Sequence, residues 1–250
     1  MYLFRLLAVF LGVLFILTFT STGLSANFYV VAGGGKKVGI EIKQLPYTIS
    51  GPGFYYITKN LDAPVGSNAI TLETGAHDVT IDLMGFAITG PPGSGEENGI
   101  FSDSYNYNVE IRNGTITGFD GRGMYVTDEE NAGIDTLRIL NVRFCYNDYG
   151  GIFIIQGNGL LIKDCAFFDN GRFGIWCYPR AQIIGNSCYR NGNSGIRSGW
   201  GSTVTGNDSS ENKGNGIEVD RHCIVAGNTC NFNKGNGIET ELYSNIFAHE

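Results

Sequence analysis

A glycine followed by an aliphatic residue recurs along the chain at nearly regular intervals, and no other feature limits the possible folds as strongly. The spacings between consecutive pairs are 24, 28, 23, 21, 21 and 21 residues. Self-similarity at a nearly fixed period is typical of a repeat architecture. The pairs are Gly99-Ile100, Gly123-Met124, Gly151-Ile152, Gly174-Ile175, Gly195-Ile196, Gly216-Ile217 and Gly237-Ile238.

The composition indicates which kind of repeat this is. The 250 residues include 37 Gly and 23 Asn, and both residue types disfavour helix, Gly by about 1 kcal/mol relative to Ala. No unit shows a helical stretch with 3.6-residue periodicity, and the units lack the leucines of a leucine-rich repeat. We therefore expect each unit to be one coil of a β-solenoid, with three short strands and three turns, stacked about 4.8 Å from the next coil.

Strand alternation predicts which side chains face the core. Alternate residues of a strand point to opposite sides, and the first and third residues after each repeat glycine are apolar or small. A second inward column is expected at Ile116, Phe144, Phe167, Cys188, Ser209 and Cys230. Asparagine columns are expected in turns, with amides bonded from coil to coil, at Asn186, Asn207 and Asn228 and at Asn147, Asn170, Asn191, Asn212 and Asn233.

These patterns resemble the right-handed parallel β-helix proteins of the pectin-lyase-like superfamily. The resemblance covers about residues 44–250 and rests on VTIDLMGFAITG (79–90), VEIRNGTITGF (109–119), LRILNVRF (137–144) and the GN…NGI units from residue 185 onward. It implies an all-β, right-handed parallel β-helix of about seven coils. It does not imply one activity, because the superfamily contains lyases, hydrolases, epimerases and adhesins.

The N-terminal residues differ from the repeats. An apolar run at 6–19, preceded by Arg5 and followed by small and polar residues, predicts a signal peptide over 1–26. The protein is then secreted or periplasmic, with no membrane span after cleavage; the alternative is an uncleaved anchor. Residues 27–65 are expected to cap the first coil with a β-hairpin, formed by 47–50 and 54–58 around Gly51-Pro52-Gly53.

The predicted β-helix itself occupies 66–250. Its pattern stops at 248–250, where a further coil would begin, so we expect either a fragment of a longer β-helix or a last coil that is covered by a partner or frayed.

The six cysteines are expected to be buried free thiols. Cys188 and Cys230 share a column but lie two coils, or about 9.6 Å, apart. A disulfide requires Cα atoms within roughly 7 Å. No two cysteines are column neighbours in adjacent coils, and no CxxC spacing is present.

The outward residues after each repeat glycine change from aromatic to charged along the chain. The first outward column is Phe101, Tyr125, Phe153, Trp176, Arg197, Glu218 and Glu239. The second is Asp103, Thr127, Ile155, Tyr178, Gly199, Asp220 and Glu241. Aromatic faces beside carboxylates and guanidinium groups suit a sugar polymer. The resemblance implies a substrate groove along this kind of strand stack.

Candidate ligand-binding residues are those on or beside the charged end of these columns: Trp176, Tyr178, Arg180, Trp200, Arg221 and Glu241. Candidate catalytic residues are Glu218, Asp220, Glu239 and Arg197. The resemblance implies Arg197 or Arg221 as the base of pectate-lyase-like chemistry. Carboxyl groups about 5–9 Å apart can hydrolyse glycosides, and crowded carboxylates can hold Ca²⁺. The alternative for the acids is a solvated acidic face. The alternative for Phe101, Tyr125 and Phe153 is packing under the long turns at 91–98 or 128–135.

The net charge of −7 argues against nucleic acid as a partner. The function that we expect is binding of extracellular polysaccharide, with no cofactor other than Ca²⁺. One alternative is a lyase or glycoside hydrolase acting on a uronate-rich polymer, although the pectin-hydrolase motifs (NTD, GHG, RIK) and the DPH run of alginate epimerases are missing. A second is a periplasmic accessory protein of copper-enzyme maturation, which the three Met and three His do not favour.

Overall fold

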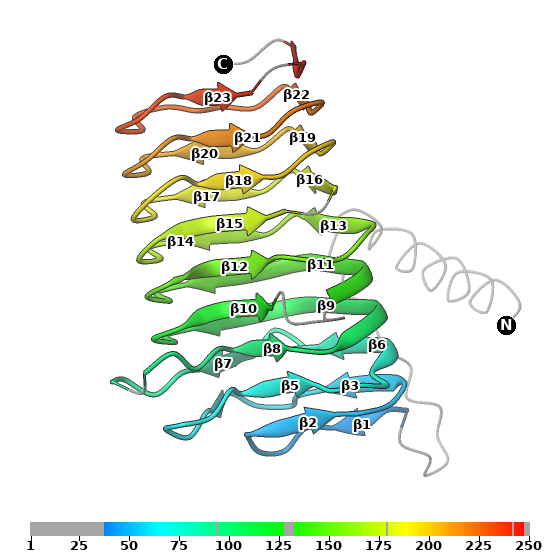
Figure 1. Ribbon diagram of the computed structural model, residues 1–250. Helices are drawn as coiled ribbons and strands as arrows, with labels where there is room; N and C mark the ends of the chain where they lie inside the picture. Colours follow the sequence, from blue (N-terminus) through cyan, green and yellow to red (C-terminus); the bar gives the residue numbers. More distant parts are fainter. Residues whose placement is uncertain (1–37, 94, 128–132, 179, 242, 248–250) are drawn as a thin grey trace, which may run out of the picture. The chain divides into compact units, whose positions relative to one another are not determined.

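The computed structural model describes residues 38–93, 95–127, 133–178, 180–241 and 243–247. From residue 39 onward these form one compact unit. The strands are stacked as successive coils, from β1 and β2 in blue to β22 and β23 in orange and red (Figure 1). Every strand pairing is parallel. The all-β solenoid expected from the repeat is therefore confirmed.

One side of the solenoid is a nine-stranded sheet that contains the strand after each repeat glycine. Its strands are β2 (Tyr47–Ile49), β5 (Ile70–Leu72), β8 (Ile100–Ser102), β10 (Arg122–Val126), β12 (Gly150–Ile154), β15 (Phe173–Cys177), β18 (Ile196–Ser198), β21 (Ile217–Val219) and β23 (Ile238–Thr240). The repeat marks seven of these strands, and β2 and β5 extend the stack toward the N-terminus.

The other strands form a fifteen-stranded sheet that folds around the remaining two sides. One side carries β1 (Ile40–Glu41), β3 (Gly53–Tyr56), β6 (His77–Asp82), β13 (Leu160–Lys163), β16 (Ala181–Ile184), β19 (Thr203–Thr205), β22 (Ile224–Ala226) and β24 (Asn245–Phe247). The other side carries β4 (Leu61–Asp62), β7 (Ala87–Thr89), β14 (Ala166–Phe168), β17 (Ser187–Tyr189) and β20 (Asp208–Ser210). β9 (Tyr105–Thr117) and β11 (Gly133–Cys145) run along both sides.

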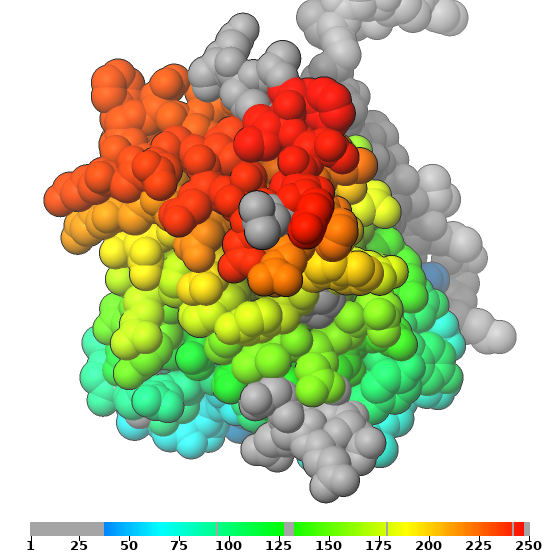
Figure 2. Space-filling model, turned by 45° about the horizontal axis from the view of Figure 1, so that its top comes forward, coloured from blue at the N-terminus to red at the C-terminus, as the bar shows by residue number. Residues whose placement is uncertain are grey.

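The register of the nine-stranded sheet confirms the expected columns. Met124 pairs with Ile100 and with Ile152, and the same column continues through Ile175, Ile196 and Ile217. These side chains are almost fully buried and form a continuous apolar ladder. Figure 2 shows the same stacking from outside, as bands of colour that pass from red and orange through yellow to green. Equivalent residues of successive coils therefore lie one strand spacing apart.

The asparagine columns form buried ladders of hydrogen bonds. Asn191 Nδ2 donates to Asn212 Oδ1 at 3.0 Å and to the Phe167 carbonyl at 3.0 Å. Its Oδ1 accepts from the backbone N–H of Asn170 at 3.3 Å and from the Asn170 amide at 3.0 Å. The other column behaves in the same way, with Asn186 donating to Asn207 Oδ1 at 3.0 Å. The ladders satisfy backbone groups that the turns would otherwise leave buried without partners.

The predicted N-terminal hairpin is wrong for the residues that the structure describes. β2 pairs in parallel with β5, whereas β3 pairs in parallel with β1 and β6, so the two segments belong to different sheets of one coil. Gly51 and Pro52 turn the chain from one sheet into the other. Ile49 and Tyr55 face the core, and the next coil supplies parallel partners that a hairpin would leave unused. Residues 27–37 of the expected cap lie outside the described residues.

The predicted signal peptide over 1–26 likewise lies outside the described residues. Within the part that the structure describes, no helix has the length and apolar character needed to cross a membrane.

All six cysteines are free, as expected, and five of them are buried. Burial raises the pKa of Cys165 and Cys230 to about 11 and that of Cys177 to about 12. Cys165 occupies the ladder position one coil before Asn186, whose Oδ1 accepts its backbone N–H at 3.0 Å. The thiols therefore act as small core side chains that remain protonated at neutral pH.

The ladder should contribute measurably to stability. We expect Asn191→Ala to lower the free energy of unfolding by about 3 kcal/mol, because it leaves the Phe167 carbonyl and the Asn170 N–H buried without partners. The exposed Asn236 is the matched control, and its replacement by Ala should change stability by less than about 0.5 kcal/mol. Denaturant unfolding measures both. Equal effects of the two substitutions would contradict a structural role for the ladder.

The thiols can be counted chemically. Unfolded but unreduced protein should take up six alkyl groups, one for each cysteine of the chain. Folded protein at neutral pH should react far more slowly, because the thiols are buried and their raised pKa leaves almost no thiolate. Mass spectrometry measures the label. A count below six that returns to six after reduction would show a disulfide.

Candidate functional site

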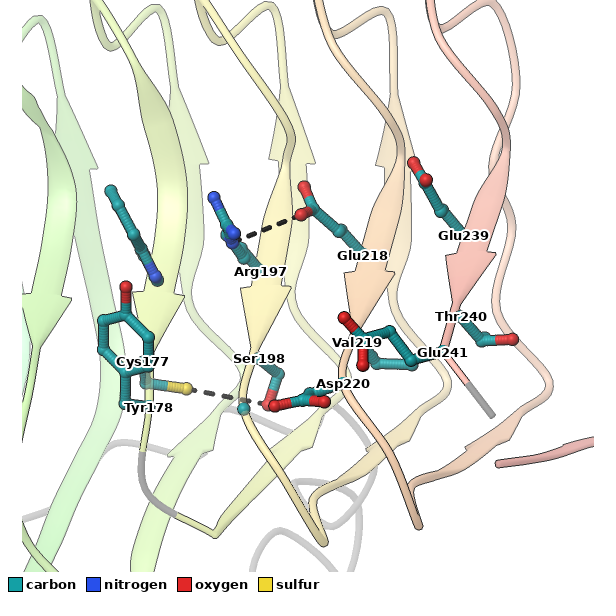
Figure 3. A pocket seen from close by; sticks show the side chains of 12 residues that line it. Cys177, Tyr178, Arg197, Ser198, Glu218, Val219, Asp220, Glu239, Thr240 and Glu241 are labelled. Atoms are coloured by element: carbon teal, nitrogen blue, oxygen red, sulfur yellow. Dashed lines mark hydrogen bonds and ion pairs between the residues drawn. The ribbon is translucent and has the colours of Figure 1, made fainter. Parts of the chain in front are cut away.

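The outward columns frame a shallow hollow over the last four strands of the nine-stranded sheet, with a volume of about 160 Å³. Figure 3 shows its polar side chains projecting from consecutive strands, with Arg197 beside Glu218. Gly199 also lines the hollow, and a side chain at this position would collide with the backbone of Tyr178 in the preceding coil. The outward residues that line it are Trp176, Tyr178, Arg197, Gly199, Glu218, Asp220, Glu239 and Glu241.

One end of the hollow is aromatic. The Trp176 ring lies 4.4 Å from Phe153 and 4.6 Å from Phe173, measured between centroids. Tyr178 lies 5.7 Å from Trp176 and is 49% exposed. Trp176 is half-buried because these rings and Arg197 pack around it. Tyr178 is therefore the more accessible of the two rings.

Arg197 joins the aromatic end to the acidic end. Its guanidinium lies 4.8 Å from the Trp176 ring centroid, and its Nε lies 3.2 Å from Glu218 Oε1. Glu218 Oε2 also accepts a hydrogen bond from the Ser194 hydroxyl at 3.4 Å. Arg197 is therefore held by a ring on one side and a carboxylate on the other, which leaves it poorly placed to act as a catalytic base.

The remaining carboxylates are each held by a neighbour. Asn215 donates to Glu239 through its side-chain amide. Asp220 accepts the backbone N–H of Arg221 at 2.7 Å. The Arg221 side chain reaches Glu241, with Nε 3.1 Å from Oε2, and both of these side chains are more than half exposed. The structure thus gathers all four predicted acids in one place, where they outnumber the basic side chains.

Three predicted ligand-binding residues, Arg180, Trp200 and Arg221, lie beside the hollow rather than in it. Arg180 places its guanidinium 3.9 Å from the Trp200 ring centroid. Trp200 is 44% exposed and contacts His222 edge-on at 5.9 Å, and His222 stacks on Tyr243 at 5.4 Å. These residues lie in the turns that follow strands of the nine-stranded sheet, and the rings of Trp200, His222 and Tyr243 form an aromatic ledge there.

The aromatic column continues away from the hollow. Tyr125 stacks on Phe153 at 5.7 Å and contacts Phe101 at 5.9 Å. The Arg122 guanidinium lies 4.2 Å from the Tyr125 centroid, and burial lowers the pKa of this arginine. Phe101, Tyr125 and Phe153 are half-buried. Glu96 and Glu97 of the long turn line a second hollow with Phe101 and Tyr125, so this turn borders the aromatic column.

No group of three or more His, Cys, Asp or Glu side chains within the described residues is arranged to hold a metal ion. Calcium at the four carboxylates therefore stays a prediction from the sequence.

Sequence reasoning missed the residues that orient the acids. Ser194, Asn215 and Asn236 occupy the position before the repeat glycine in three successive coils. Ser194 Oγ accepts the Asn215 N–H at 3.2 Å, and Asn215 Oδ1 accepts the Asn236 N–H at 2.8 Å. The column itself can be seen in the aligned repeats. Its contacts with Glu218 and Glu239 depend on side-chain conformations that the alignment does not contain.

Comparisons with known proteins agree with the architecture. A family described as right handed beta helix region matches residues 132–249. No curated protein matches the chain.

Several solved structures are similar. The A-module of the Azotobacter vinelandii mannuronan C-5 epimerase AlgE4 is 15% identical with a TM-score of 0.60, and the match covers 79% of this chain and 68% of that one. The pectate lyase Pel9A is 12% identical with a TM-score of 0.50, and the match covers 80% of this chain and 70% of that one. The periplasmic alginate epimerase AlgG is 15% identical with a TM-score of 0.51, and the match covers 78% of this chain and 59% of that one. The chain therefore has the fold of a right-handed parallel β-helix.

Proposed function

We propose that the outer face of the nine-stranded sheet binds polysaccharide. The observation that carries this proposal is the continuous passage from stacked aromatic rings to a polar hollow on adjacent strands, from Phe153 through Trp176 and Tyr178 to Glu218. Rings pack against the apolar faces of sugars, and carboxylates and guanidinium groups bind hydroxyls. The strands form a straight track, so that equivalent side chains recur about every 4.8 Å along a linear polymer.

The similar structures support this proposal by what they act on. Mannuronan, pectate and alginate are polysaccharides, and the proteins named for them share this fold at low identity. Similarity at that level shows the fold, so the choice of ligand class depends on the side chains of the hollow. We also propose that the protein is exported from the cytoplasm, because an extracellular polysaccharide lies outside the cell.

Catalysis is the second candidate, as a lyase or glycoside hydrolase that uses Glu218, Asp220 or Glu239. The contacts in the hollow favour binding over this alternative. Arg197 is paired with Glu218, and Asn215 holds Glu239. A polar network of this kind orients side chains for recognition.

We expect Tyr178→Ala to weaken glycan binding about tenfold, because removal of one exposed stacking surface costs about 1.4 kcal/mol of binding free energy. Tyr107→Ala is the matched control, since Tyr107 is 43% exposed but lies on β9 of the other sheet. Isothermal titration calorimetry with the best-bound glycan of a panel measures both. If Tyr107→Ala weakens binding as much as Tyr178→Ala does, the binding face is wrongly assigned.

Binding should occur without turnover. Incubation of the protein with uronate, neutral and amino polysaccharides, with and without Ca²⁺, should release no reducing ends and form no unsaturated products. Absorbance and reducing-sugar assays measure both. Product that disappears in Glu218→Gln or Glu239→Gln protein would establish the catalytic alternative instead.

A further inference from the structure

We infer that Arg122 and Arg172 bind one anionic substituent, a sulfate ester or a carboxylate, on an otherwise neutral glycan. This inference rests on the proposed function and specifies its ligand class. The two arginines border the middle of the aromatic column, where both lie beside Phe153. Arg122 begins β10, and Arg172 directly precedes β15, which belongs to the second coil after that of β10. The coil between them contributes Tyr149.

Tyr149 brings the two guanidinium groups to one ring. The Arg172 guanidinium lies 4.6 Å from the Tyr149 centroid, and that of Arg122 lies 5.3 Å from the same centroid. Arg122 also lies 4.2 Å from the centroid of Tyr125 and 5.1 Å from that of Phe153. Aromatic rings attract cations through their quadrupoles, but they carry no net charge. The rings therefore position two like charges without neutralising them.

Neither guanidinium has an ion pair or a hydrogen bond within the part of the chain that the structure describes. Glu96, whose charge acts on Arg122 from farther away, accepts the Tyr149 hydroxyl at 3.4 Å. Most other arginines have a carboxylate oxygen within 3.2 Å, namely Arg112, Arg138, Arg190, Arg197 and Arg221.

The unpaired state of Arg122 is unfavourable. Burial lowers the pKa of Arg122, and the nearby charge of Arg172 acts in the same direction. Both effects disfavour the charged form of a side chain that stays protonated in proteins. An anion placed between the two guanidinium groups would relieve both effects, because it supplies the missing counter-charge and accepts their hydrogen bonds.

A small hollow lies between the two arginines, with a volume of about 20 Å³. This is enough room for about one water molecule, and so for one oxygen of an anionic group. Phe153 and Trp176 of the aromatic column line the same hollow. A sugar stacked on the column therefore reaches the arginines with a substituent. Guanidinium groups suit sulfate and carboxylate because their N–H donors match the geometry of such oxygens.

Carboxylates on both sides of the arginines favour a glycan that is otherwise neutral. The acidic hollow includes Glu218 on β21, two strands or about 9.6 Å beyond β15. In the other direction, Glu96 and Glu97 line the second hollow, which Arg122 also borders. A polymer with a charge on every sugar would bring further anions beside these carboxylates, where they are repelled. An isolated anionic substituent avoids that repulsion.

The test compares oligosaccharides that differ in one charged group. Calorimetry with the full chain at low salt uses a xylan oligosaccharide with one glucuronate substituent, a galactan oligosaccharide with one sulfate ester, the neutral form of each, and a galacturonate oligomer of equal length. At least one singly charged oligosaccharide should bind about tenfold or more tightly than its neutral form, and more tightly than galacturonate. The tighter of the two charged ligands identifies the anionic group.

The variants assign this preference to the two arginines. Arg172→Gln should reduce it at least about threefold, and the double variant Arg122→Gln/Arg172→Gln should abolish it. Arg143→Gln is the control, because Arg143 is exposed on β11 of the other sheet, and it should leave the preference unchanged. Unfolding curves confirm that each variant is folded. Arg172 is exposed, so its single variant remains a test if the double variant does not fold.

The outcomes separate this inference from the proposed function. If the neutral forms bind as tightly as the charged ones and Tyr178→Ala weakens both, glycan binding stands and the inference is wrong. If galacturonate is the tightest ligand, or if the preference survives in the arginine variants, the inference is also wrong. If none of the oligosaccharides binds, both proposals fail.

Discussion

Parallel backbone pairing between successive coils is the constraint on which every other feature of this protein depends. It places equivalent residues one strand spacing apart and turns a sequence repeat into columns of like side chains. The buried Asn170–Asn191–Asn212 ladder maintains this register at the turns, because each amide bonds both to the next coil and to a backbone carbonyl. The inward isoleucine column provides the apolar burial that stabilises the stack.

The candidate site is a direct consequence of that register. The residues after the repeat glycine that are not needed in the core project outward on adjacent strands. Trp176, Arg197 and Glu218 are therefore neighbours because they are register partners, although 21 residues separate each from the next. The asparagines and serines before the glycine form a further column that orients the acids. The fold and the candidate site are thus specified by the same repeat.

The sequence was sufficient to predict the features that depend on the repeat period alone. The inward isoleucines, the two asparagine columns and the gathering of Glu218 with Glu239 all follow from the 21-residue spacing. The N-terminal residues were misread because Gly51-Pro52-Gly53 is also a turn signal for a hairpin, and the first coil lacks the Gly-Ile pair that marks the later ones. The stacking of Arg180 on Trp200 and the burial of Trp176 depend on side-chain conformation and on neighbours in other coils. The period of the sequence repeat predicts neither side-chain conformation nor these neighbours.

Intrinsic tryptophan fluorescence tests the assignment of the binding face most directly. The chain contains two tryptophans, and Trp176 lines the hollow while Trp200 lies on the ledge beside it. A glycan that binds by calorimetry should change the emission in a saturable way, with the same dissociation constant. In Trp200→Phe protein the remaining signal from Trp176 should still respond. Tight binding that leaves the emission of both tryptophans unchanged would place the ligand elsewhere and contradict the account.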